Sequence, residues 1–341
     1  MKVGIVGLPN AGKSTLFNAL TRAGAQTAEY PFTTVDPNVA VVPVPDERLA
    51  RVGETLGLAT RIPEQIEFVD VAGLVRGAHQ GEGLGNRFLG HIREVDAILH
   101  VVRTFEHDNV GHPHGRLDPA ADMEVVEAEL LLADLESAER RLADASRRAG
   151  GGVREARAEA ELWQRVVDDL GAGRPAPAEA GLLTSKPVLV VANVGEGEDL
   201  PQELAARGAI AVCALDEAEL GELEPEESAA MREELGLASG ALERIVRAAH
   251  ELLGLVTFFT AVGDKEVRAR SLTRGGTALE AAGKVHTDMQ KGFVRAEVIG
   301  WTDLVEAGSF AHARELGKLR TEGRDYVVED GDVITIKFTQ A

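Results

Sequence analysis

The stretch that decides the fold is residues 7–14, which read Gly-Leu-Pro-Asn-Ala-Gly-Lys-Ser. It fits the pattern G-x-x-x-x-G-K-[ST], in which backbone N–H groups cradle phosphates, the lysine reaches the terminal phosphates and the hydroxyl binds Mg²⁺. A Val/Ile-rich run at 2–6 precedes it and a helical pattern at 15–20 follows it, so a bound phosphate would also face the positive end of a helix. The sequence predicts a nucleotide-binding loop formed by Asn10, Ala11, Gly12, Lys13, Ser14 and Thr15.

Short Val/Ile-rich runs recur along the first two-thirds of the chain. They lie at 2–6, 39–44, 66–69, 97–102, 187–192 and 209–213. Short apolar runs that alternate with helical patterns are typical of parallel strands buried on both faces. The sequence therefore predicts an α/β domain of the P-loop type, with a doubly wound and mainly parallel sheet.

The interval between the fourth and fifth of these runs is too long for one crossover helix. Within it, apolar residues recur at alternating steps of three and four in two series, at 128–145 and 156–170, which is the spacing of a coiled-coil seam. Three glycines at 150–152 separate the two series and would let the chain turn. We predict an antiparallel helical hairpin over 122–170, within an inserted arm that ends at residue 180. The alternative is two helices packed flat on the sheet.

The pattern changes after an amphipathic helical segment at 241–253. Five short strand-like runs follow, at 256–260, 266–271, 294–299, 326–328 and 333–338. An Asp-Gly pair at 330–331 is a hairpin-turn signal, and one helix fits near 277–285, which together predict a small mixed α+β domain. The predicted domains are a nucleotide-binding domain at 1–121 and 181–254, an inserted arm at 122–180 and a C-terminal domain at 255–341.

The composition restricts the class of protein and its partners. The 341-residue chain has 36 Lys and Arg against 56 Asp and Glu, a net charge of −20. Such a chain does not attract nucleic acid as a whole, which argues against DNA binding, and any RNA contact needs a local patch. Residues 255–341 have a net charge of −1 and are the better host for one. The single cysteine excludes an internal disulfide framework, and no apolar run approaches the ~18 residues that span a bilayer, so we expect a cytoplasmic protein without membrane contact.

Two further segments are expected to sense the γ-phosphate. Asp70-Val-Ala-Gly73 follows the strand at 66–69, where Asp70 can hold the Mg²⁺ shell and Gly73 can offer a backbone N–H to the phosphate. The next residues are rich in glycine, as an order–disorder switch requires. Upstream, the Thr34 hydroxyl, chosen over that of Thr33, would complete the metal sphere. The predicted metal ligands are Ser14, Thr34 and Asp70.

The base is expected to lie over the segment that follows the strand at 187–192. Guanine-specific proteins carry N-K-x-D here, whereas this chain has Asn193-Val194-Gly195-Glu196. The lysine is absent and the carboxylate is one methylene longer, so the paired hydrogen bonds to guanine should be lost or strained, at about 1.5–3 kcal/mol each. An asparagine amide can still pair with adenine. The sequence therefore favours ATP, or relaxed specificity, with Cys213 and Ala214 backing the base.

Taken together, these segments resemble the YchF or Obg-like ATPase family, a branch of the Obg-related P-loop proteins. The resemblance rests on residues 7–14, Pro-Phe-Thr-Thr at 31–34, Asp-Val-Ala-Gly-Leu at 70–74 with its continuation to Asn86, Asn-x-x-Glu at 193–196, and the segments at 320–326 and 328–333. It extends over essentially the whole chain and implies a helical arm and a C-terminal β-grasp domain of the TGS type. Two positions depart from the family: Thr33 stands where cysteine is frequent, and the arm is short.

The resemblance also bears on catalysis. Leu74 follows the D-x-x-G segment, where Ras-like proteins carry a glutamine that orients the attacking water, so we expect slow intrinsic hydrolysis. Candidates to replace that glutamine are Arg76, His79, His112 and His114. The resemblance favours His112, acting with Lys13 and Gly73, and it implies a K⁺ ion near Asn10.

The resemblance further implies a regulator of translation or the stress response that binds ATP or ADP and associates with the ribosome, for which we expect the large subunit. Candidate RNA-facing charges are Arg140, Arg141, Arg147 and Arg148 on the arm, and Arg314, Lys318, Arg320 and Arg324 in the C-terminal domain. We therefore expect a Mg²⁺-dependent P-loop ATPase that acts as a switch. The alternatives are a GTP-specific ribosome-assembly GTPase and a nucleotide-gated ribosome-binding module in which hydrolysis is incidental.

Overall fold

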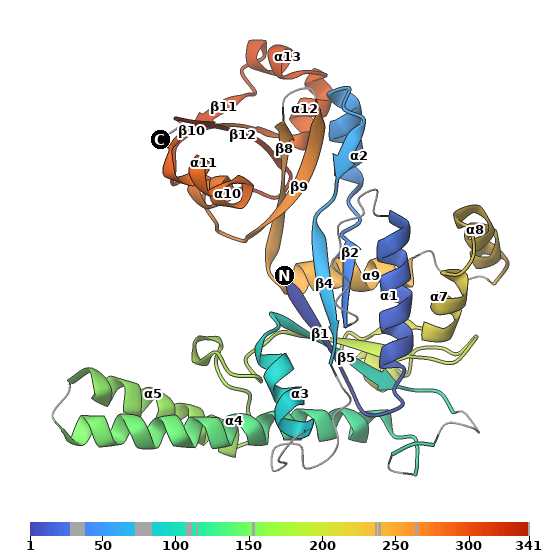
Figure 1. Ribbon diagram of the computed structural model, residues 1–341, viewed down its shortest axis with the longest axis vertical. Coiled ribbons are helices and arrows are strands. Elements are labelled where there is room, and N and C mark those ends of the chain that lie inside the picture. The colour runs from blue at the N-terminus through green and yellow to red at the C-terminus, as the bar shows by residue number, and fades with distance from the viewer. Residues whose placement is uncertain are drawn as a thin grey trace. The chain divides into compact units, whose positions relative to one another are not determined.

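The computed structural model describes residues 1–27, 38–71, 84–106, 111–113, 115–151, 154–235, 237, 240–262 and 265–339. The chain divides into two compact units (Figure 1). We call Met1–Val42 with Glu67–Ile245 the N-terminal unit, and Pro43–Ile66 with Val246–Ala341 the C-terminal unit. Within the described part of the chain, no helix combines the length and the apolar character needed to cross a bilayer.

The N-terminal unit is built on a six-stranded sheet with the order β2-β4-β1-β5-β6-β7. The strands are β1 (Lys2–Val6), β2 (Val39–Pro43), β4 (Gln65–Asp70), β5 (Ala97–Arg103), β6 (Val188–Asn193) and β7 (Ile210–Val212). β1 pairs in parallel with β4 and β5, and the pairs β5–β6 and β6–β7 are also parallel. All seven residues of β5 are buried, as expected for a central strand covered on both faces. The predicted mainly parallel sheet is confirmed.

Helices of this unit connect the strands. They are α1 (Lys13–Thr27), α3 (Leu84–Arg93), α4 (Pro119–Gly150), α5 (Arg154–Gly171), α6 (Gln202–Ala205), α7 (Ala214–Leu220) and α8 (Pro225–Glu234), and α9 (Ala241–Leu252) leads into the C-terminal unit. A single 3₁₀ turn at Ala178–Ala180 precedes β6. α1 starts directly at the lysine of the phosphate loop, so the loop lies between the end of β1 and the first turn of α1, as the sequence predicts.

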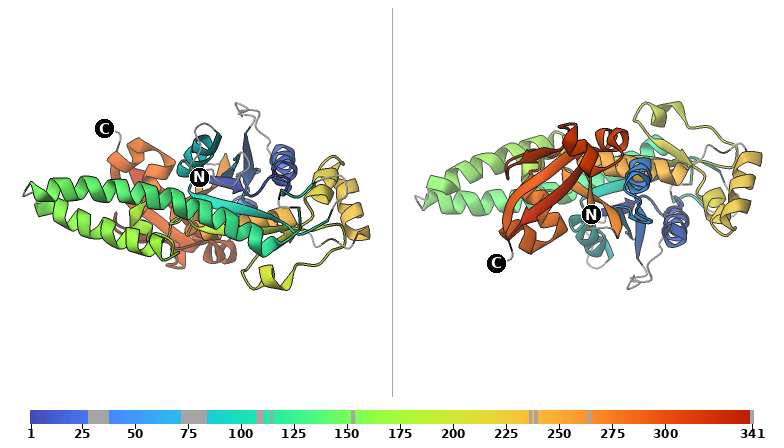
Figure 2. Two further views of the ribbon diagram at one scale, coloured as in Figure 1. Left: turned by 90° about the horizontal axis from the view of Figure 1, so that it is seen from below. Right: turned by 90° about the horizontal axis from the view of Figure 1, so that it is seen from above.

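The long helix α4 has two different environments. Its first turns, with Val126, Leu130 and Ala133, pack in one core with Leu8 and Val71 of the N-terminal unit. Its remaining turns pack against α5, and the two helices lie side by side in both views of Figure 2. This pairing confirms the predicted helical hairpin and excludes the alternative of two helices packed flat on the sheet.

The C-terminal unit is built on a second six-stranded sheet, with the order β11-β10-β12-β8-β9-β3. Its strands are β3 (Thr60–Ile62), β8 (Leu255–Val262), β9 (Glu266–Thr273), β10 (Phe293–Gly300), β11 (Arg320–Glu322) and β12 (Asp332–Phe338). Its helices are α2 (Glu47–Thr55), α10 (Ala278–Val285), α11 (Thr287–Lys291), α12 (Trp301–Ala307) and α13 (Phe310–Glu315). Parallel and antiparallel pairs occur together, and helices lie between the strands along the chain, which confirms the predicted mixed α+β fold of this region.

Two local predictions for this region have different outcomes. The helix expected near 277–285 is confirmed as α10, which starts at a capping box formed by Thr277 and Glu280. The strand expected at 326–328 is wrong, because only an isolated bridge between Val327 and Thr277 forms there. A run of Tyr-Val-Val has strand propensity, but the turn that contains Asp330 follows too soon for a ladder to extend.

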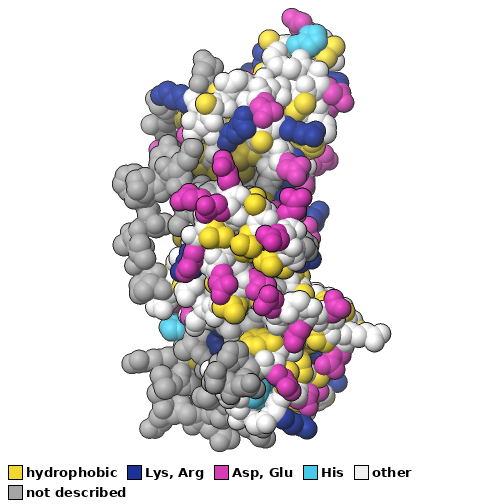
Figure 3. Space-filling view, turned by 90° about the vertical axis from the view of Figure 1, so that its right-hand side faces the viewer, with side chains coloured by type: hydrophobic (Ala, Val, Ile, Leu, Met, Phe, Trp, Pro, Cys, Tyr) yellow, Lys and Arg dark blue, Asp and Glu magenta, His cyan; other side chains and the backbone are white. Residues whose placement is uncertain are grey.

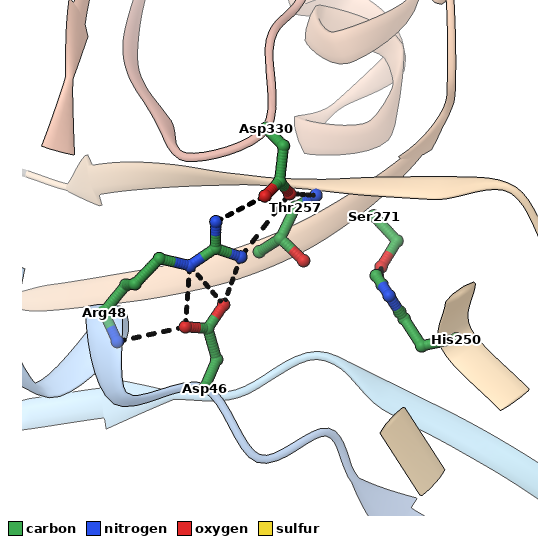
Figure 4. A network of polar contacts seen from close by, with 6 residues as sticks. All are labelled: Asp46, Arg48, His250, Thr257, Ser271 and Asp330. Atoms are coloured by element: carbon green, nitrogen blue, oxygen red, sulfur yellow. Dashed lines mark hydrogen bonds and ion pairs between the residues drawn. The ribbon is translucent and has the colours of Figure 1, made fainter. Parts of the chain in front are cut away.

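Residues 43–66 belong to the C-terminal unit, although the sequence-based division placed them in the nucleotide-binding domain. β3 pairs in parallel with β9, and Leu49, Val52 and Leu58 enter the core that contains Phe259. The guanidinium of Arg48 donates hydrogen bonds to the carboxylates of Asp46 and Asp330 (Figure 4). Asp330 in turn accepts from the backbone N–H of Thr257 at 2.8 Å. The segment is therefore an integral part of this sheet and core.

Candidate nucleotide-binding site

A cavity of about 610 Å³ lies at the carboxyl ends of the strands of the N-terminal unit. Four loops line it: the phosphate loop, the segment after β5, the segment after β6 and the start of α7. The lining residues are Asn10, Gly12, Lys13, Ser14, Thr15, Phe105, Glu106, Asn193, Val194, Gly195, Glu196, Glu198, Cys213, Ala214 and Leu215. A crevice at the carboxyl edge of a parallel sheet is where open α/β domains bind nucleotides. The structure thus brings the predicted loop and the predicted base-binding residues to one cavity, with Ala11 buried in the loop beside it.

Two positions of the phosphate loop have no room for a side chain, because other atoms lie close to their Cα. A Cβ at Gly7 would overlap the carbonyl oxygen of Val101, and a Cβ at Gly12 would overlap the side-chain amide of Asn193. Both glycines have positive φ, at 157° and 91°. The glycine pattern of the motif therefore has a direct steric cause in this chain.

Lys13 lies in the loop with 8% of its surface exposed. Its Nζ donates a hydrogen bond to the carbonyl oxygen of Leu8 at 2.8 Å, so the amine is folded back onto the loop. Burial lowers the pKa of Lys13, against the opposing effect of the Asp70 carboxylate. A partly desolvated ammonium is a strong partner for a phosphate oxygen.

Ser14 and Asp70 converge at the end of β4. The Oγ of Ser14 donates to Oδ2 of Asp70 at 3.4 Å. Burial raises the pKa of Asp70, while Lys13 and Ser14 counteract the shift. Mg²⁺ is commonly bound by one or two protein oxygens together with substrate phosphates, and a hydroxyl paired with a carboxylate fits that donor set. Among the described residues, no group of three or more His, Cys, Asp and Glu side chains is placed to hold a metal by itself.

Two predicted residues of the γ-phosphate sensor, Thr34 and Gly73, lie outside the described residues, as do Thr33, Leu74, Arg76, His79 and His114. Their predicted roles stay predictions.

Asn193 has a role in the structure that its position in the motif did not reveal. Its side chain is almost fully buried, and its Nδ2 donates to the carbonyl oxygen of Ala11 at 3.0 Å. Its Oδ1 accepts from the backbone N–H of Ala214, also at 3.0 Å. Asn193 therefore ties the phosphate loop to the start of α7, and its orientation is determined before any base arrives.

The other residues at the expected base-binding end of the cavity differ in exposure and in hydrogen bonding. Glu196 is exposed, whereas Glu198, which was not predicted, accepts from the backbone N–H of Gly195 at 3.0 Å. Cys213 is half-buried, and burial raises its pKa to about 11, so its thiol stays protonated at neutral pH. Phe105 also lines the cavity and was not predicted. Its position two residues after the end of a fully buried strand was the available signal.

His112 does not line the cavity. Its Nε2 lies 2.7 Å from Oδ2 of Asp122, in the first turn of α4, and the two side chains are only 8% and 7% exposed. The preceding residue, Gly111, accepts a hydrogen bond from Nδ2 of Asn10 at 3.0 Å. The backbone beside His112 thus contacts the phosphate loop, but the imidazole is directed to α4. Its predicted role in positioning water stays a prediction.

Most basic side chains considered for RNA contact already have partners. Those in ion pairs are Arg140, Arg147, Arg148, Arg314, Lys318 and Arg320. Arg141 stacks on the ring of Trp163 at 4.6 Å. Acidic side chains predominate on the face drawn in Figure 3, in keeping with the net charge of −20. Surface ion pairs of this kind are weak, so they can exchange partners at low energetic cost.

Two family models match parts of the chain. Residues 2–134 match a family described as "50S ribosome-binding GTPase". Residues 255–339 match YchF-GTPase_C, which is described as "Protein of unknown function (DUF933)".

Full-length relatives share this organisation. The chain is 45% identical to the ribosome-binding ATPase YchF of Bacillus subtilis and 46% identical to that of Escherichia coli O157:H7, and each alignment covers 99% of both chains. A solved structure, that of the YchF GTPase of Schizosaccharomyces pombe, matches with a TM-score of 0.87 at 33% identity, over 99% of this chain and 97% of that one. Similarity of this degree over nearly the full length, with the same fold, shows that the chain belongs to the YchF family.

Proposed function

We propose that this protein is a Mg²⁺-dependent P-loop ATPase that binds the ribosome and acts as a regulatory switch in translation or the stress response, in the cytoplasm. The observation that carries the proposal is that Lys13 and Ser14 line a nucleotide-sized cavity while the Ser14 hydroxyl meets the carboxylate of Asp70. The bacterial relatives at 45% and 46% identity are named ribosome-binding ATPases, which supports both activities.

In this mechanism, the chain supplies positioning and charge rather than a covalent intermediate. Lys13 exchanges the carbonyl of Leu8 for the β- and γ-phosphate oxygens, and the backbone N–H groups of residues 10–15 hold the phosphates. Ser14, Asp70 and Thr34 would hold Mg²⁺, which would supply positive charge to the transferred phosphoryl group. Gly73 donates its N–H to the γ-phosphate, and His112 orients the attacking water. Asn10 would offer its side-chain carbonyl oxygen to K⁺, which would supply further positive charge.

The base-binding residues favour adenine over guanine. Asn193 is held between Ala11 and Ala214, so its amide reaches the base in a single orientation. Glu196 replaces the aspartate that reads guanine and is one methylene too long for the paired contact. Val194, Cys213 and Ala214 form the remaining wall of the base pocket.

A competition experiment tests this assignment. A fluorescent ADP analogue is displaced by ATP and by GTP in the presence of Mg²⁺ and K⁺. ATP should win by tenfold or more, which equals at least about 1.4 kcal/mol, close to the lower limit for one charge-assisted hydrogen bond. If GTP wins instead, the protein is a ribosome-associated GTPase, an activity named in the description of the matching N-terminal family and in that of the S. pombe structure.

For ribosome binding, we propose contact with the large subunit through the arm, α4 with α5, or through the C-terminal domain at 255–341. The description "50S ribosome-binding GTPase" supports the choice of subunit. The ion-paired arginines of the arm would exchange their acidic partners for RNA phosphates, an exchange that salt weakens. Sedimentation with purified 50S and 30S subunits at increasing salt concentrations tests both points.

One observation favours a second candidate function. Nε2 of His112 is occupied by Asp122, and Leu74 cannot orient water, so hydrolysis can be incidental to nucleotide-gated binding. In that case His112→Ala would leave ribosome binding intact, while the affinity for the ribosome would differ between the ATP and ADP states. Equal affinity in the two states would refute this second candidate.

A further inference from the structure

The segment between β5 and α4 joins the phosphate loop to the arm through two successive contacts. On one side, Nδ2 of Asn10 donates to the carbonyl oxygen of Gly111 at 3.0 Å. On the other, Nε2 of His112 meets Oδ2 of Asp122 at 2.7 Å. Gly111 and His112 are adjacent, so a displacement at Asp122 is carried to Asn10 by a single peptide unit.

The Asn10 end of this path has a left-handed backbone conformation. Among the described residues, Asn10 is the one non-glycine residue with positive φ, at 64°. Asparagine adopts this conformation more readily than other side-chain-bearing residues, and side-chain hydrogen bonds help to fix it. Its side chain makes a hydrogen bond outside the loop, to Gly111, so the position of Gly111 bears directly on the shape of the phosphate loop.

The Asp122 end is equally constrained. Asp122 lies in the first turn of α4, where a carboxylate is favoured by the helix dipole, and its side chain is 7% exposed. A buried carboxylate keeps its partner, because leaving either group unpaired is costly. The next residue, Met123, packs in the core with Val102 of β5, so this turn is fixed against the sheet.

α4 then continues without interruption into the arm. Further along it, the carboxylate of Asp134 accepts hydrogen bonds from the backbone N–H groups of Leu183 and Thr184 and from the Thr184 hydroxyl. The helix that carries Asp122 is therefore tied to the N-terminal unit by these contacts and extends without interruption to Gly150.

We infer that Asp122 is a positioning residue for the nucleotide site, and that it acts on the phosphate loop through His112, Gly111 and Asn10. The carboxylate of Asp122 fixes the imidazole of His112 by a hydrogen bond. His112 is covalently joined to Gly111, whose carbonyl oxygen accepts a hydrogen bond from Asn10. The inference rests on the proposed nucleotide site and extends it, because it places one determinant of nucleotide affinity on the arm helix itself.

The test compares nucleotide dissociation constants in the full-length protein, measured with a fluorescent ADP analogue. Asp122→Asn keeps the size of the side chain and removes its charge. We expect it to weaken binding by about 3- to 30-fold, the range found for residues that couple through a packed network. His112→Ala should have a similar effect, and the double variant should bind no more weakly than the weaker single variant.

Asp118→Ala is the matched control. Asp118 caps the same helix by accepting from the N–H of Ala121 at 3.1 Å, so its removal takes away one charge and weakens the same turn without touching His112. Its dissociation constant should stay within twofold of wild type. Asp122→Glu retains the charge, should fall between wild type and Asp122→Asn, and serves as the second variant where Asp122→Asn does not fold.

Three outcomes would overturn the inference: unchanged affinity in Asp122→Asn, additive losses in the double variant, or equal losses in the Asp118→Ala control. None of them depends on hydrolysis. If the wild-type protein binds ADP but does not hydrolyse ATP, the proposed ATPase function fails, while the affinity comparison still decides the role of Asp122.

Discussion

Replacing Arg48 by alanine should selectively destabilise the C-terminal unit. The guanidinium is 24% exposed and donates to Asp46 at 2.8 Å and to Asp330 at 2.5 Å (Figure 4). Asp330 lies 282 residues further along the chain, so this contact joins α2 to the turn before β12. Although burial opposes ionisation, the hydrogen bonds to Asp46 and Asp330 raise the pKa of Arg48 above its usual range.

The expected magnitude follows from these contacts. A hydrogen bond to a charged group contributes about 1.5–3 kcal/mol, and solvent exposure of Asp330 reduces that value. The contact with Asp46 is local and contributes less, while the guanidinium over the Phe259 ring, at 5.7 Å, adds about 0.5 kcal/mol. A loss of about 2 kcal/mol is expected, which lowers the Tm of a unit of this size by about 6–10 °C.

The pH dependence gives a second readout of the same contact. Although burial opposes ionisation, hydrogen bonds from Arg48 and the N–H of Thr257 lower the pKa of Asp330 below its ordinary value of 3.8. A lowered folded-state pKa means that this stabilisation is complete above pH ~4 and disappears as the pH falls through the folded-state value. Wild type and Arg48→Ala should therefore differ at pH 7 and converge in acid.

The assay is thermal and urea unfolding of the full-length protein, followed by far-UV circular dichroism and by limited proteolysis that reports on the C-terminal unit. Arg51→Ala is the control, because Arg51 lies on the same helix and is exposed. A loss below about 0.5 kcal/mol in Arg48→Ala, or an equal loss in Arg51→Ala, would refute the reasoning, since surface substitutions away from such contacts stay within that range.

Three further predictions concern the N-terminal unit. Asp134→Ala removes a buried acceptor of three hydrogen bonds and should lower the free energy of unfolding by about 3 kcal/mol. Urea unfolding measures this loss, and in the same assay the exposed control Glu136→Ala should lose less than about 0.5 kcal/mol. Glu196→Asp shortens the side chain to the length that reads guanine, so the affinity for GTP relative to ATP should rise. Competition with a fluorescent ADP analogue measures this ratio, and an unchanged ratio would contradict the assignment of Glu196 to base recognition. Lys13→Met should weaken ATP binding by at least about 100-fold, because two charge-assisted hydrogen bonds to phosphate are lost, and calorimetric titration with ATP and Mg²⁺ measures this. The Tm should stay within a few degrees of wild type, because the ammonium donates to a carbonyl of its own loop.

The local patterns of the chain were sufficient for the parts of the fold that depend on nearby residues. The G-x-x-x-x-G-K-S segment, a strand before it and a helix after it predict the phosphate loop, because the steric need for glycine and the helix N-terminus are local properties. The alternating steps of three and four predict the α4–α5 pair, because such spacing leaves an apolar stripe that a partner helix must cover.

Other features depend on partners far away in the chain, and for these local pattern is uninformative. The three residues of β3 carry no strong strand signal, yet they pair with β9 more than 200 residues later and bring residues 43–66 into the C-terminal sheet. Some basic residues expected to face RNA have acidic partners that sequence spacing does not reveal, such as Glu297 for Arg314.

The sequence alone therefore determined the chemistry that is available: a phosphate loop, a carboxylate for Mg²⁺ and an altered guanine motif, because each is set by residue type at short spacing. Only the tertiary structure decided how those groups are held. It directs Asn193 to Ala11 and Ala214 and His112 to Asp122, because the hydrogen-bond partner of a buried polar group is chosen by which elements pack together.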